Sequence, residues 1–378
     1  MQVDWKPYAA GLAAEATHPN SFWWDSVSEV PRHLLVPRWY TQEAGRWMCV
    51  DGPADEEAWV KAAFADSTLV TRVGPTHADH ARADRPAVGR PTSSSTLPSL
   101  VVAMMEHARV APGDRVMDLA TGSGYSAALG CHLLGDELVT TMDVDAYLTE
   151  VAAERLDFLG YHPQVITGDA TGPLPSVFDR IVSMVSVPRI PASWLLALPA
   201  GGRLVTTIAG TGLIIAADKT RDGGATGRVE WDRAAFMATR TGSDYPGLLD
   251  GVFATAGEDE GEVRLSPFPV LDVMRAWEVW SMLTLAAPGI EHRTGTSDDG
   301  SRMTWMLHPD GSWARARTAH GEHTTTVHQG GPRRLYDLLD DIRQRWLERG
   351  ELPVYGAAVA ITPEGETTLS RDGWSATF

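Results

Sequence analysis

The chain has 378 residues, of which 43% are apolar and 21% charged, and its formal net charge is −17. This acidity argues against nucleic-acid binding, because phosphate contacts need clustered Lys and Arg. No run approaches the roughly 20 apolar residues of a membrane helix, and the N-terminus lacks the basic and apolar regions of a secretion signal. Cys49 and Cys131 cannot form a disulfide framework, so a reducing, cytoplasmic location is expected.

The first 240 residues are predicted to contain a helical start followed by an α/β sheet. Residues 1–75 are expected to be mostly helical, since "AAGLAAEA" and "EEAWVKAAF" have apolar residues at helical spacing. Short apolar strands then alternate with helices, which predicts right-handed βαβ units and a doubly wound, Rossmann-like parallel sheet. Strands are expected at 115–119, 138–142, 164–167, 180–185, 203–208, 211–218 and 234–240, and helices at 126–134, 146–159 and 192–198.

The character of the sequence changes near residue 241, where "TGSDYPG" is typical of a linker. Residues 1–241 are therefore predicted to form one domain and residues 242–378 an α+β accessory domain. Helices are expected in it at 271–287 and 333–349, and strands at 303–308, 313–319, 324–328, 354–362 and 366–370.

A glycine-rich turn, "DLATGSGYS" at 118–126, joins the first predicted strand of the sheet to a helix. Such a turn is typical of nucleotide binding, and its G-x-G-x-x-A pattern alone also fits a dinucleotide. Three acids stand at the ends of successive strands: Asp118, Asp143 and Asp169. The carboxyl ends of parallel strands meet at one edge of the sheet, so these acids are expected to converge there.

The chemistry of the three acids favours S-adenosylmethionine over a dinucleotide. Asp118 can accept hydrogen bonds from an ammonium group, which NAD lacks. Asp143 follows the turn by roughly 20 residues, a spacing suited to ribose hydroxyls, and Asp169 could accept from an adenine amino group. The remaining alternative is a generic α/β domain in which these acids only cap helices.

Four segments of residues 22–240 resemble the protein-L-isoaspartate O-methyltransferase family. They are "VPRHLLVP" (30–37), "RVMDLATGSGYSAALG" (115–130), "VITGDA" (165–170) and "FDRIVSMVSVPRIP" (178–191). The resemblance implies a class I methyltransferase sheet, S-adenosylmethionine as cofactor with S-adenosylhomocysteine as product, and esterification of an abnormal aspartyl carboxylate. The cofactor-binding residues that it implies are Asp118, Ala120, Thr121, Gly122, Ser123, Gly124, Tyr125, Asp143, Val144, Gly168, Asp169 and Ala170.

The sequence departs from the family at two places. Ala120 replaces the first glycine of the turn, which is tolerable if its φ is negative. The substrate-side segment reads "GRPTSSSTLP" (89–98), with Thr96 where the family has serine. A conserved cofactor half, an altered substrate half and an added C-terminal part resemble the homologues that tailor ribosomal peptide natural products, namely lanthipeptides and graspetides. This implies methylation of an ordinary aspartate in a constrained peptide, with collapse of the ester to aspartimide and then isoaspartate.

Methyl transfer to a carboxylate needs no general base, because the group is already ionised at neutral pH. Catalysis is then expected from positioning and exclusion of water. The hydroxyls of Thr96, Ser95 and Ser93 are the candidate catalytic groups that could hydrogen-bond the carboxylate. The alternative for "TSSST" is a solvated loop that caps the helix after Pro98.

Two other functions are kept: a repair-type isoaspartate methyltransferase, and a non-catalytic cofactor-binding interaction protein. The intact acids argue against the second. The tryptophans could line a peptide groove, although such residues more often form core. His320, His323 and His328 have irregular spacing and no cysteine nearby, so no metal site is expected. The oligomeric state is left open.

Overall fold

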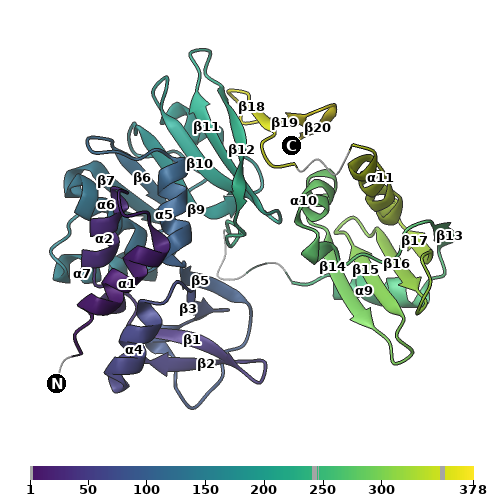
Figure 1. Ribbon diagram of the computed structural model, residues 1–378, viewed down its shortest axis with the longest axis horizontal. Helices are drawn as coiled ribbons and strands as arrows, with labels where there is room; N and C mark the ends of the chain where they lie inside the picture. The colour runs from purple at the N-terminus through teal and green to yellow at the C-terminus, as the bar shows by residue number, and fades with distance from the viewer. Residues whose placement is uncertain (1–2, 241–244, 246, 350–353) are drawn as a thin grey trace.

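The computed structural model describes residues 3–240, 245, 247–349 and 354–378. Figure 1 shows a large N-terminal part, which contains the central sheet, and a smaller C-terminal part with its own sheet. Of the predicted linker 241–247, only Tyr245 and Gly247 are among the described residues. Within the described ranges, none of the helices has both the length and the apolar character needed to cross a membrane.

The N-terminal segment contains a sheet as well as helices, so the expectation that residues 1–75 are mostly helical is wrong. Its helices are α1 (Lys6–Ala16), α2 (Trp23–Glu29), α3 (Arg32–Leu35) and α4 (Glu56–Ala63). Its strands are β1 (Arg38–Glu43), β2 (Arg46–Asp51), β3 (Leu69–Val73), β4 (Thr76–His77) and β5 (Pro91–Ser95). The β1–β2 hairpin turns at Ala44 and Gly45, with φ of 47° and 76°, the left-handed pair that matches strand twist.

The segment "TSSST" is a strand and not the capping loop considered for it. β5 pairs antiparallel with β3, with Ser95 opposite Leu69 and Ser93 opposite Arg72. The helix α5 (Pro98–His107) follows, and its N-cap is Leu97, which offers no side-chain cap. Thr96 therefore does not cap α5 and stands at the junction between strand and helix.

The central sheet has ten strands in the order β20-β19-β18-β12-β11-β10-β9-β6-β7-β8. Its parallel core is the predicted one. The apolar runs of the inner strands are mostly buried on both faces, whereas the edge strand β8 is partly exposed. The core strands are β6 (Val116–Leu119), β7 (Val139–Asp143), β8 (Gln164–Thr167), β9 (Arg180–Val187) and β10 (Arg203–Ile208). The chain runs from β6 outward to β8 and then returns to β9 on the other side of β6, which makes β6/β9 the topological switch point.

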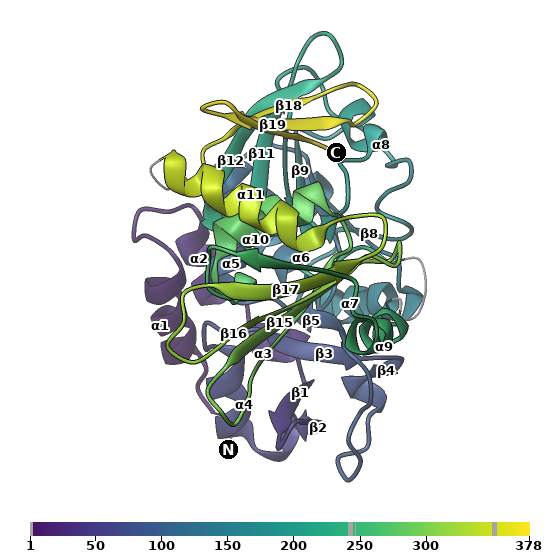
Figure 2. The ribbon, with the colours of Figure 1, turned by 90° about the vertical axis from the view of Figure 1, so that its right-hand side faces the viewer.

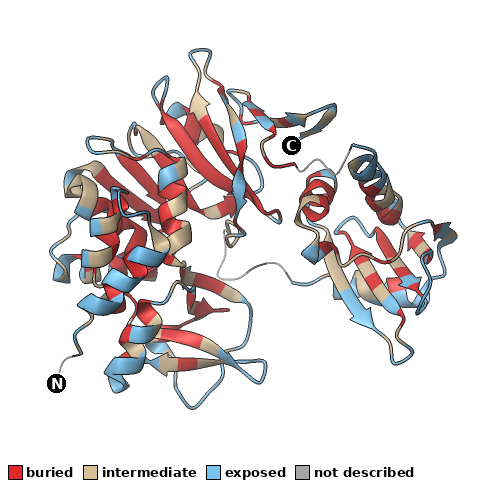
Figure 3. Cartoon of the chain, in the orientation of Figure 1, coloured by how far each residue is buried: buried red, intermediate tan, exposed pale blue. Residues whose placement is uncertain are grey.

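Side chains alternate between two cores along the central strands, where buried residues concentrate (Figure 3). Val116 packs on the face covered by α1, α5 and α6 (Tyr125–Leu134), whereas its neighbour Met117 packs on the opposite face. The second face is covered by α8 (Ala192–Leu196) and by residues of α10 (Trp277–Ala286). The remaining helix of the cofactor half is α7 (Ala146–Phe158), whose Leu156 joins the first core.

The antiparallel side of the sheet differs from the prediction. β11 (Leu213–Lys219) is followed by β12 (Ala225–Arg233), in a stretch that glycines and charges marked as a loop. Gly227 is required there, since a Cβ would lie 1.9 Å from the carbonyl oxygen of Ala216 on β11. Residues 234–240 are not the expected strand. They cross the end of β9, where Ser186 bonds Met237 and Thr239 through the backbone.

The C-terminal part has a five-stranded antiparallel sheet in the order β13-β17-β16-β15-β14. Its strands are β13 (Glu262–Ser266), β14 (Glu291–Thr296), β15 (Arg302–Leu307), β16 (Trp313–Thr318) and β17 (Thr325–Gly330). Its helices are α9 (Asp250–Glu258), α10 and α11 (Leu335–Glu348). The predicted helix 271–287 is interrupted before α10, and α9, β13 and β14 were not predicted.

The last strands belong to the central sheet, so residues 242–378 do not form one separate unit. β18 (Ala358–Ile361) pairs with β12, and β19 (Thr367–Arg371) and β20 (Trp374–Thr377) extend the same sheet. Figures 1 and 2 place α10 and α11 between these strands and the C-terminal sheet. The sequence did not reveal this return, because the pairing of β18 with β12 joins residues far apart in the chain.

Candidate active site

The glycine turn leaves the sheet at the switch point through three residues in left-handed conformation. Ala120, Gly122 and Gly124 have φ of 74°, 53° and 82°, and Gly124 is the N-cap of α6. The expectation of a negative φ at Ala120 is wrong. Ala120 adopts the left-handed backbone conformation that glycine favours, and the Ala120 N–H donates to the carbonyl of Met142 on β7 at 2.8 Å.

Asp118 is completely buried at the end of β6. Its Oδ2 accepts hydrogen bonds from Ser126 Oγ at 2.9 Å and Thr141 Oγ1 at 2.8 Å. Its Oδ1 is buried and has no partner among the described residues. Burial raises the pKa of Asp118 to about 7, against the lowering effect of the two hydroxyls. An unpaired buried oxygen of this kind costs free energy unless a ligand donates to it.

Asp143 ends β7 and holds the turn from the other side. Its Oδ2 accepts from the Gly122 N–H at 3.0 Å and its Oδ1 from the Asp145 N–H at 3.0 Å. Burial raises its pKa, while these backbone donors oppose the rise. Asp169 follows β8 and is exposed, and its Oδ1 accepts from the backbone N–H and hydroxyl of Thr171.

A cavity of about 240 Å³ lies between this turn and the β5–α5 junction. It brings together most of the residues predicted from the sequence: Ser93, Ser95, Thr96, Ala120, Thr121, Gly122, Ser123, Tyr125, Asp143, Val144, Asp169 and Ala170. Asp118, Gly124 and Gly168 do not line it. Asp118 and Gly124 lie in the strand end and helix start beneath the turn, and the Gly168 N–H donates to the Asp143 carbonyl.

Sequence reasoning missed part of the cavity wall. Met184 and Val185 from β9, Leu148 from α7, Leu100 from α5, residues 235–240 and Tyr245 all line it. The segment 235–240 was read as a strand, so its place over the switch point was not anticipated. Only its position directly after the antiparallel strands could have suggested this.

The hydroxyls of "TSSST" differ in their surroundings. Ser93 is buried and its Oγ accepts from Thr71 Oγ1 at 3.0 Å. Ser95 is buried and its Oγ accepts from the guanidinium of Arg32 at 3.3 Å. Thr96 lines the cavity, and its hydroxyl has no hydrogen bond to the part of the chain that the structure describes. Of the three candidates, Thr96 is therefore the one whose hydroxyl is available to a ligand.

Arg32, from the segment "VPRHLLVP", supports the β5–α5 junction from beneath. Its guanidinium is fully buried and lies 5.3 Å from the ring centroid of Tyr125. Burial lowers its pKa to about 10, so it remains charged at neutral pH. It donates to five backbone carbonyls, those of Ala63, Ala65, Ser67, Ser95 and Thr96.

A cluster of charges ties the N-terminal sheet to the Asp143 side of the cavity. Asp145 Oδ2 lies 3.3 Å from Arg72, 3.2 Å from His77 and 3.6 Å from Arg240. Burial acts to raise the pKa of Asp145, but the bond to His77 and the charges of His77 and the two arginines lower it to about 2. Since the Asp145 N–H donates to Asp143, this cluster also fixes the Asp143 carboxylate.

Other sequence candidates lie elsewhere. His328 Nδ1 is 3.0 Å from the carbonyl of Glu260, and within the described ranges no group of three or more potential ligand residues could hold a metal ion. The considered tryptophans are packed: Trp23 and Trp24 in the first core, Trp305 against α9, and Trp277 edge-on to Trp280.

The sheet order, the turn at the switch point and the strand-end acids define the class: a class I S-adenosylmethionine-dependent methyltransferase. Residues 74–237 match the family profile described as Protein-L-isoaspartate(D-aspartate) O-methyltransferase. Among proteins of that name, the one from Archaeoglobus fulgidus is 30% identical over 192 residues, covering 50% of this chain and 72% of its own. The one from Thermococcus onnurineus is 31% identical over 153 residues, covering 39% and 69%. The chain belongs to the protein-L-isoaspartate O-methyltransferase family.

Other similarities cover different shares. The protein-L-isoaspartate O-methyltransferase of Ignicoccus hospitalis is 36% identical over 115 residues, and the match covers 29% of this chain and only 54% of that protein. A solved structure of a protein of this name is similar over 99% of both chains, at 16% identity and a TM-score of 0.49. A Plasmodium falciparum structure in complex with S-adenosyl-L-homocysteine aligns over 64% of this chain and 100% of its own, at 12% identity and a TM-score of 0.45.

Proposed function

We propose that the protein transfers the methyl group of S-adenosylmethionine to an aspartyl-type carboxylate in a peptide or protein. One observation carries the proposal: a single cavity joins the cofactor turn and Asp143 to the hydroxyl of Thr96. The chain fits the cofactor. Asp118 has an orphaned buried oxygen, and Gly122 leaves room that a side chain would fill, since a Cβ there would lie 3.1 Å from the Ser94 carbonyl oxygen.

When bound, S-adenosylmethionine supplies an electrophilic methyl group on a sulfonium. The residues of the chain hold and orient the reactants. Asp118, from beneath the turn, would favour the positively charged amino-acid end through its own charge, Asp143 would accept from ribose hydroxyls, and Asp169 would accept from the adenine amino group. The acceptor carboxylate is ionised at neutral pH and needs no base. Thr96 donates a hydrogen bond that orients it, and the surrounding wall excludes water.

Two acceptors are compatible with this chemistry. The relatives' name favours isoaspartate, the acceptor of a repair enzyme. The rewritten segment 89–98, with β5 and Thr96 at the cavity, favours an ordinary aspartate in a constrained ribosomal peptide of the lanthipeptide or graspetide kind, whose ester would close to aspartimide and open to isoaspartate. A non-catalytic cofactor-binding role is the third possibility.

Three incubations with labelled S-adenosylmethionine separate these readings: an isoaspartyl peptide, a macrocyclic aspartyl peptide, and a linear aspartyl peptide as control. Label on the isoaspartyl peptide alone assigns repair. Label on the macrocycle, later released as labelled methanol when the backbone amide nitrogen attacks the ester carbonyl, assigns tailoring. Mass spectrometry then shows the aspartimide, which is one water lighter than the unmethylated peptide. Cofactor binding with no transfer to any peptide would overturn the proposed activity.

The Thr96 hydroxyl offers a sharper test of the acceptor side. Thr96→Ser should keep most of kcat, because the hydroxyl remains. Thr96→Val keeps the shape but loses the donor, so kcat/KM should fall by roughly tenfold or more, the worth of a hydrogen bond to a charged group. Calorimetric affinity for S-adenosylhomocysteine should be unchanged in both. Normal turnover by the valine variant would make Thr96 merely structural.

A further inference from the structure

A second cavity, about 740 Å³ and open to solvent, lies beside the first. We call it the α5–α10 groove. Its walls are the start of α5, the end of β12, the start of α10 and Tyr355. Leu97 and Leu100 line both this groove and the cofactor cavity. A chain that places one residue beside Thr96 can therefore continue along α5 into the groove.

The polar walls of the groove carry acids and an exposed aromatic ring. Trp231 at the end of β12 is 62% exposed, and the guanidinium of Arg371 lies 5.3 Å from the centroid of its ring. Glu278, in the first turn of α10, has no hydrogen bond or ion pair to any described residue. Asp232 already has a partner, because its carboxylate lies 2.9 Å from Nε2 of His107. Among the residues that line the groove, Arg233 carries a positive charge and lies over the ring of Trp277 at 4.7 Å.

Tyr355 supplies an independent sign of a ligand. Its side chain is only 6% exposed, and its hydroxyl has no hydrogen-bond partner among the described residues. Burial and the nearby Glu278 raise its pKa to about 12, so the hydroxyl stays a donor at neutral pH. A buried hydroxyl without a partner is costly, and Tyr355 is one of the residues that line the groove.

We propose that the α5–α10 groove binds the residues that flank the methylated aspartyl residue, and that it prefers a basic side chain there. This rests on the proposed function. Glu278 receives the cation, Trp231 covers its aliphatic stem, and Tyr355 donates to the peptide backbone. The net charge of −17 favours approach of such a peptide. All three residues lie outside the cofactor cavity, so they act on selectivity and not on the transfer itself.

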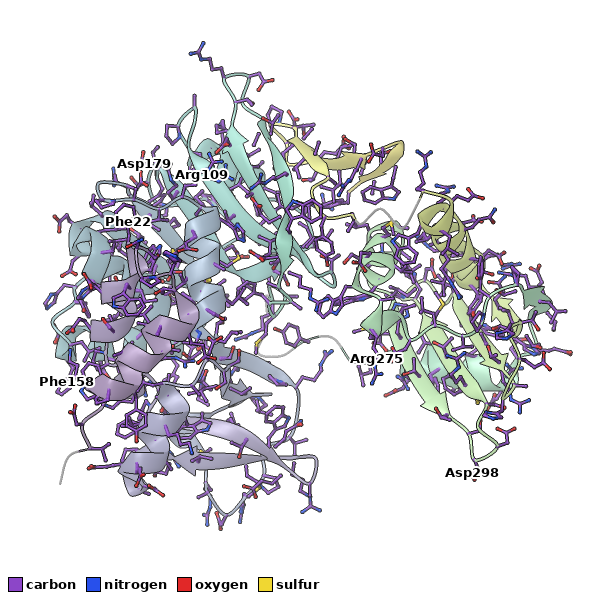
Figure 4. All side chains as sticks on the ribbon, in the orientation of Figure 1. Phe22, Arg109, Phe158, Asp179, Arg275 and Asp298 are labelled. Atoms are coloured by element: carbon purple, nitrogen blue, oxygen red, sulfur yellow. The ribbon has the colours of Figure 1, made fainter. Side chains whose placement is uncertain are left out.

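The test uses the full chain loaded with S-adenosylhomocysteine and fluorescently labelled peptides, read by anisotropy. The peptides share an isoaspartyl or macrocyclic aspartyl centre and carry lysines or glutamines on both flanks. Lysine peptides should bind about fivefold more tightly, the range of an exposed ion pair. Glu278→Gln should remove this preference. Asp298→Asn, at the far tip of the C-terminal sheet (Figure 4), is the matched control and should leave it unchanged.

Tyr355→Phe separates a ligand contact from a structural one. Removing an unpaired hydroxyl should not lower the melting temperature, yet should weaken peptide binding about three- to tenfold. Trp231→Ala should weaken it about tenfold. Phe158→Ala should not, since Phe158 is also exposed but lies on α7, away from the groove (Figure 4).

Equal binding of lysine and glutamine peptides, or an unchanged peptide affinity in Tyr355→Phe, would overturn the proposed peptide binding in the α5–α10 groove even if methylation proceeds. If Glu278→Gln abolishes the lysine preference but no peptide is methylated, the result supports peptide binding in the α5–α10 groove and overturns the proposed methylation. The two failures are therefore distinguishable.

Discussion

Ala120 holds a backbone conformation that L side chains rarely adopt, with φ of 74°. Ala120→Gly should relieve about 1–2 kcal/mol of steric strain and lose about 0.4–1 kcal/mol to unfolded-state entropy, for a net stabilisation of up to about 1.6 kcal/mol. Urea unfolding measures it as a higher midpoint at constant slope. The control is Gly122→Ala, which should destabilise because its Cβ would meet the Ser94 carbonyl. A lower midpoint for Ala120→Gly would contradict the strain argument.

Asp118 should make cofactor affinity depend on pH. Its pKa is raised to about 7 in the ligand-free protein, so between about pH 4 and 7 the folded state binds a proton that the unfolded state has released. Stability should therefore fall as pH rises through this window, by up to about 1.4 kcal/mol per pH unit. The positive charge of an ammonium group bound above the turn favours the carboxylate of Asp118 beneath it, so binding should expel the proton.

Calorimetry in two buffers of different ionisation enthalpy measures that proton release. We expect S-adenosylhomocysteine affinity to rise from pH 6 to pH 8 in the unmodified protein, with release fading at the upper end. Asp118→Asn should bind weakly and show no release attributable to this group. An identical release in the variant would place the titrating group elsewhere.

Individual site residues could be predicted from the sequence where a residue of suitable chemistry stands at the end of a predicted strand. Asp118, Asp143 and Asp169 could be chosen because each ends a short apolar run. Arg32 and Asp145 could not, because their roles depend on carbonyls and charges brought together from distant segments. Ser93 and Ser95 were chosen with Thr96, but burial turns their hydroxyls toward Thr71 and Arg32.

At the scale of elements, the β5–α5 junction depends on Arg32. Lysine retains the charge but lacks the guanidinium fork, so Arg32→Lys should leave at least two of the five carbonyls unpaired. We expect a loss of about 2–6 kcal/mol in stability, at about 1–3 kcal/mol for each of two buried unpaired groups, with KM for the peptide raised more than the Kd for S-adenosylhomocysteine. Denaturant unfolding and steady-state kinetics measure both effects.

Arg275→Lys is the control for that substitution, since this side chain is 89% exposed, at the surface of the C-terminal part (Figure 4). An Arg32→Lys variant as stable as the control would remove Arg32 from its supporting role.

The elements that could be predicted are those whose local pattern matches their environment. The inner parallel strands β6, β7, β9 and β10 are mostly buried on both faces, and their apolar runs predicted them correctly. β5 reads as a polar loop, because its alternate side chains are hydroxyls whose burial is satisfied by neighbours on β3 and α3. β12 was missed because its glycines and charged residues are typical of a loop. Gly227 is needed there only because β11 packs so closely against it, and that contact exists only in the folded sheet.

At the scale of the whole molecule, the return of the chain to the central sheet changes what a truncation does. Val359, Ile361 and Leu369 are buried in the second core, and β18 covers the edge of β12. A chain ended at residue 353 should therefore melt at a lower temperature, bind a hydrophobic dye and aggregate through the exposed edge. Calorimetry and light scattering measure this. A monodisperse truncation with an unchanged melting temperature would contradict the role of these strands.

The same return has a consequence for synthesis. β12 is synthesised well before its partner strand β18, so Ala225 cannot pair until Ile361 has been added to the chain. At 5–20 residues per second, that wait is on the order of ten seconds, during which an open strand edge leaves the ribosome beside a growing C-terminal part. Nascent chains at high local density should then pair edge to edge. We expect yield in the cell to depend on elongation rate and on chaperones that shield β-edges more than on the final stability of the fold.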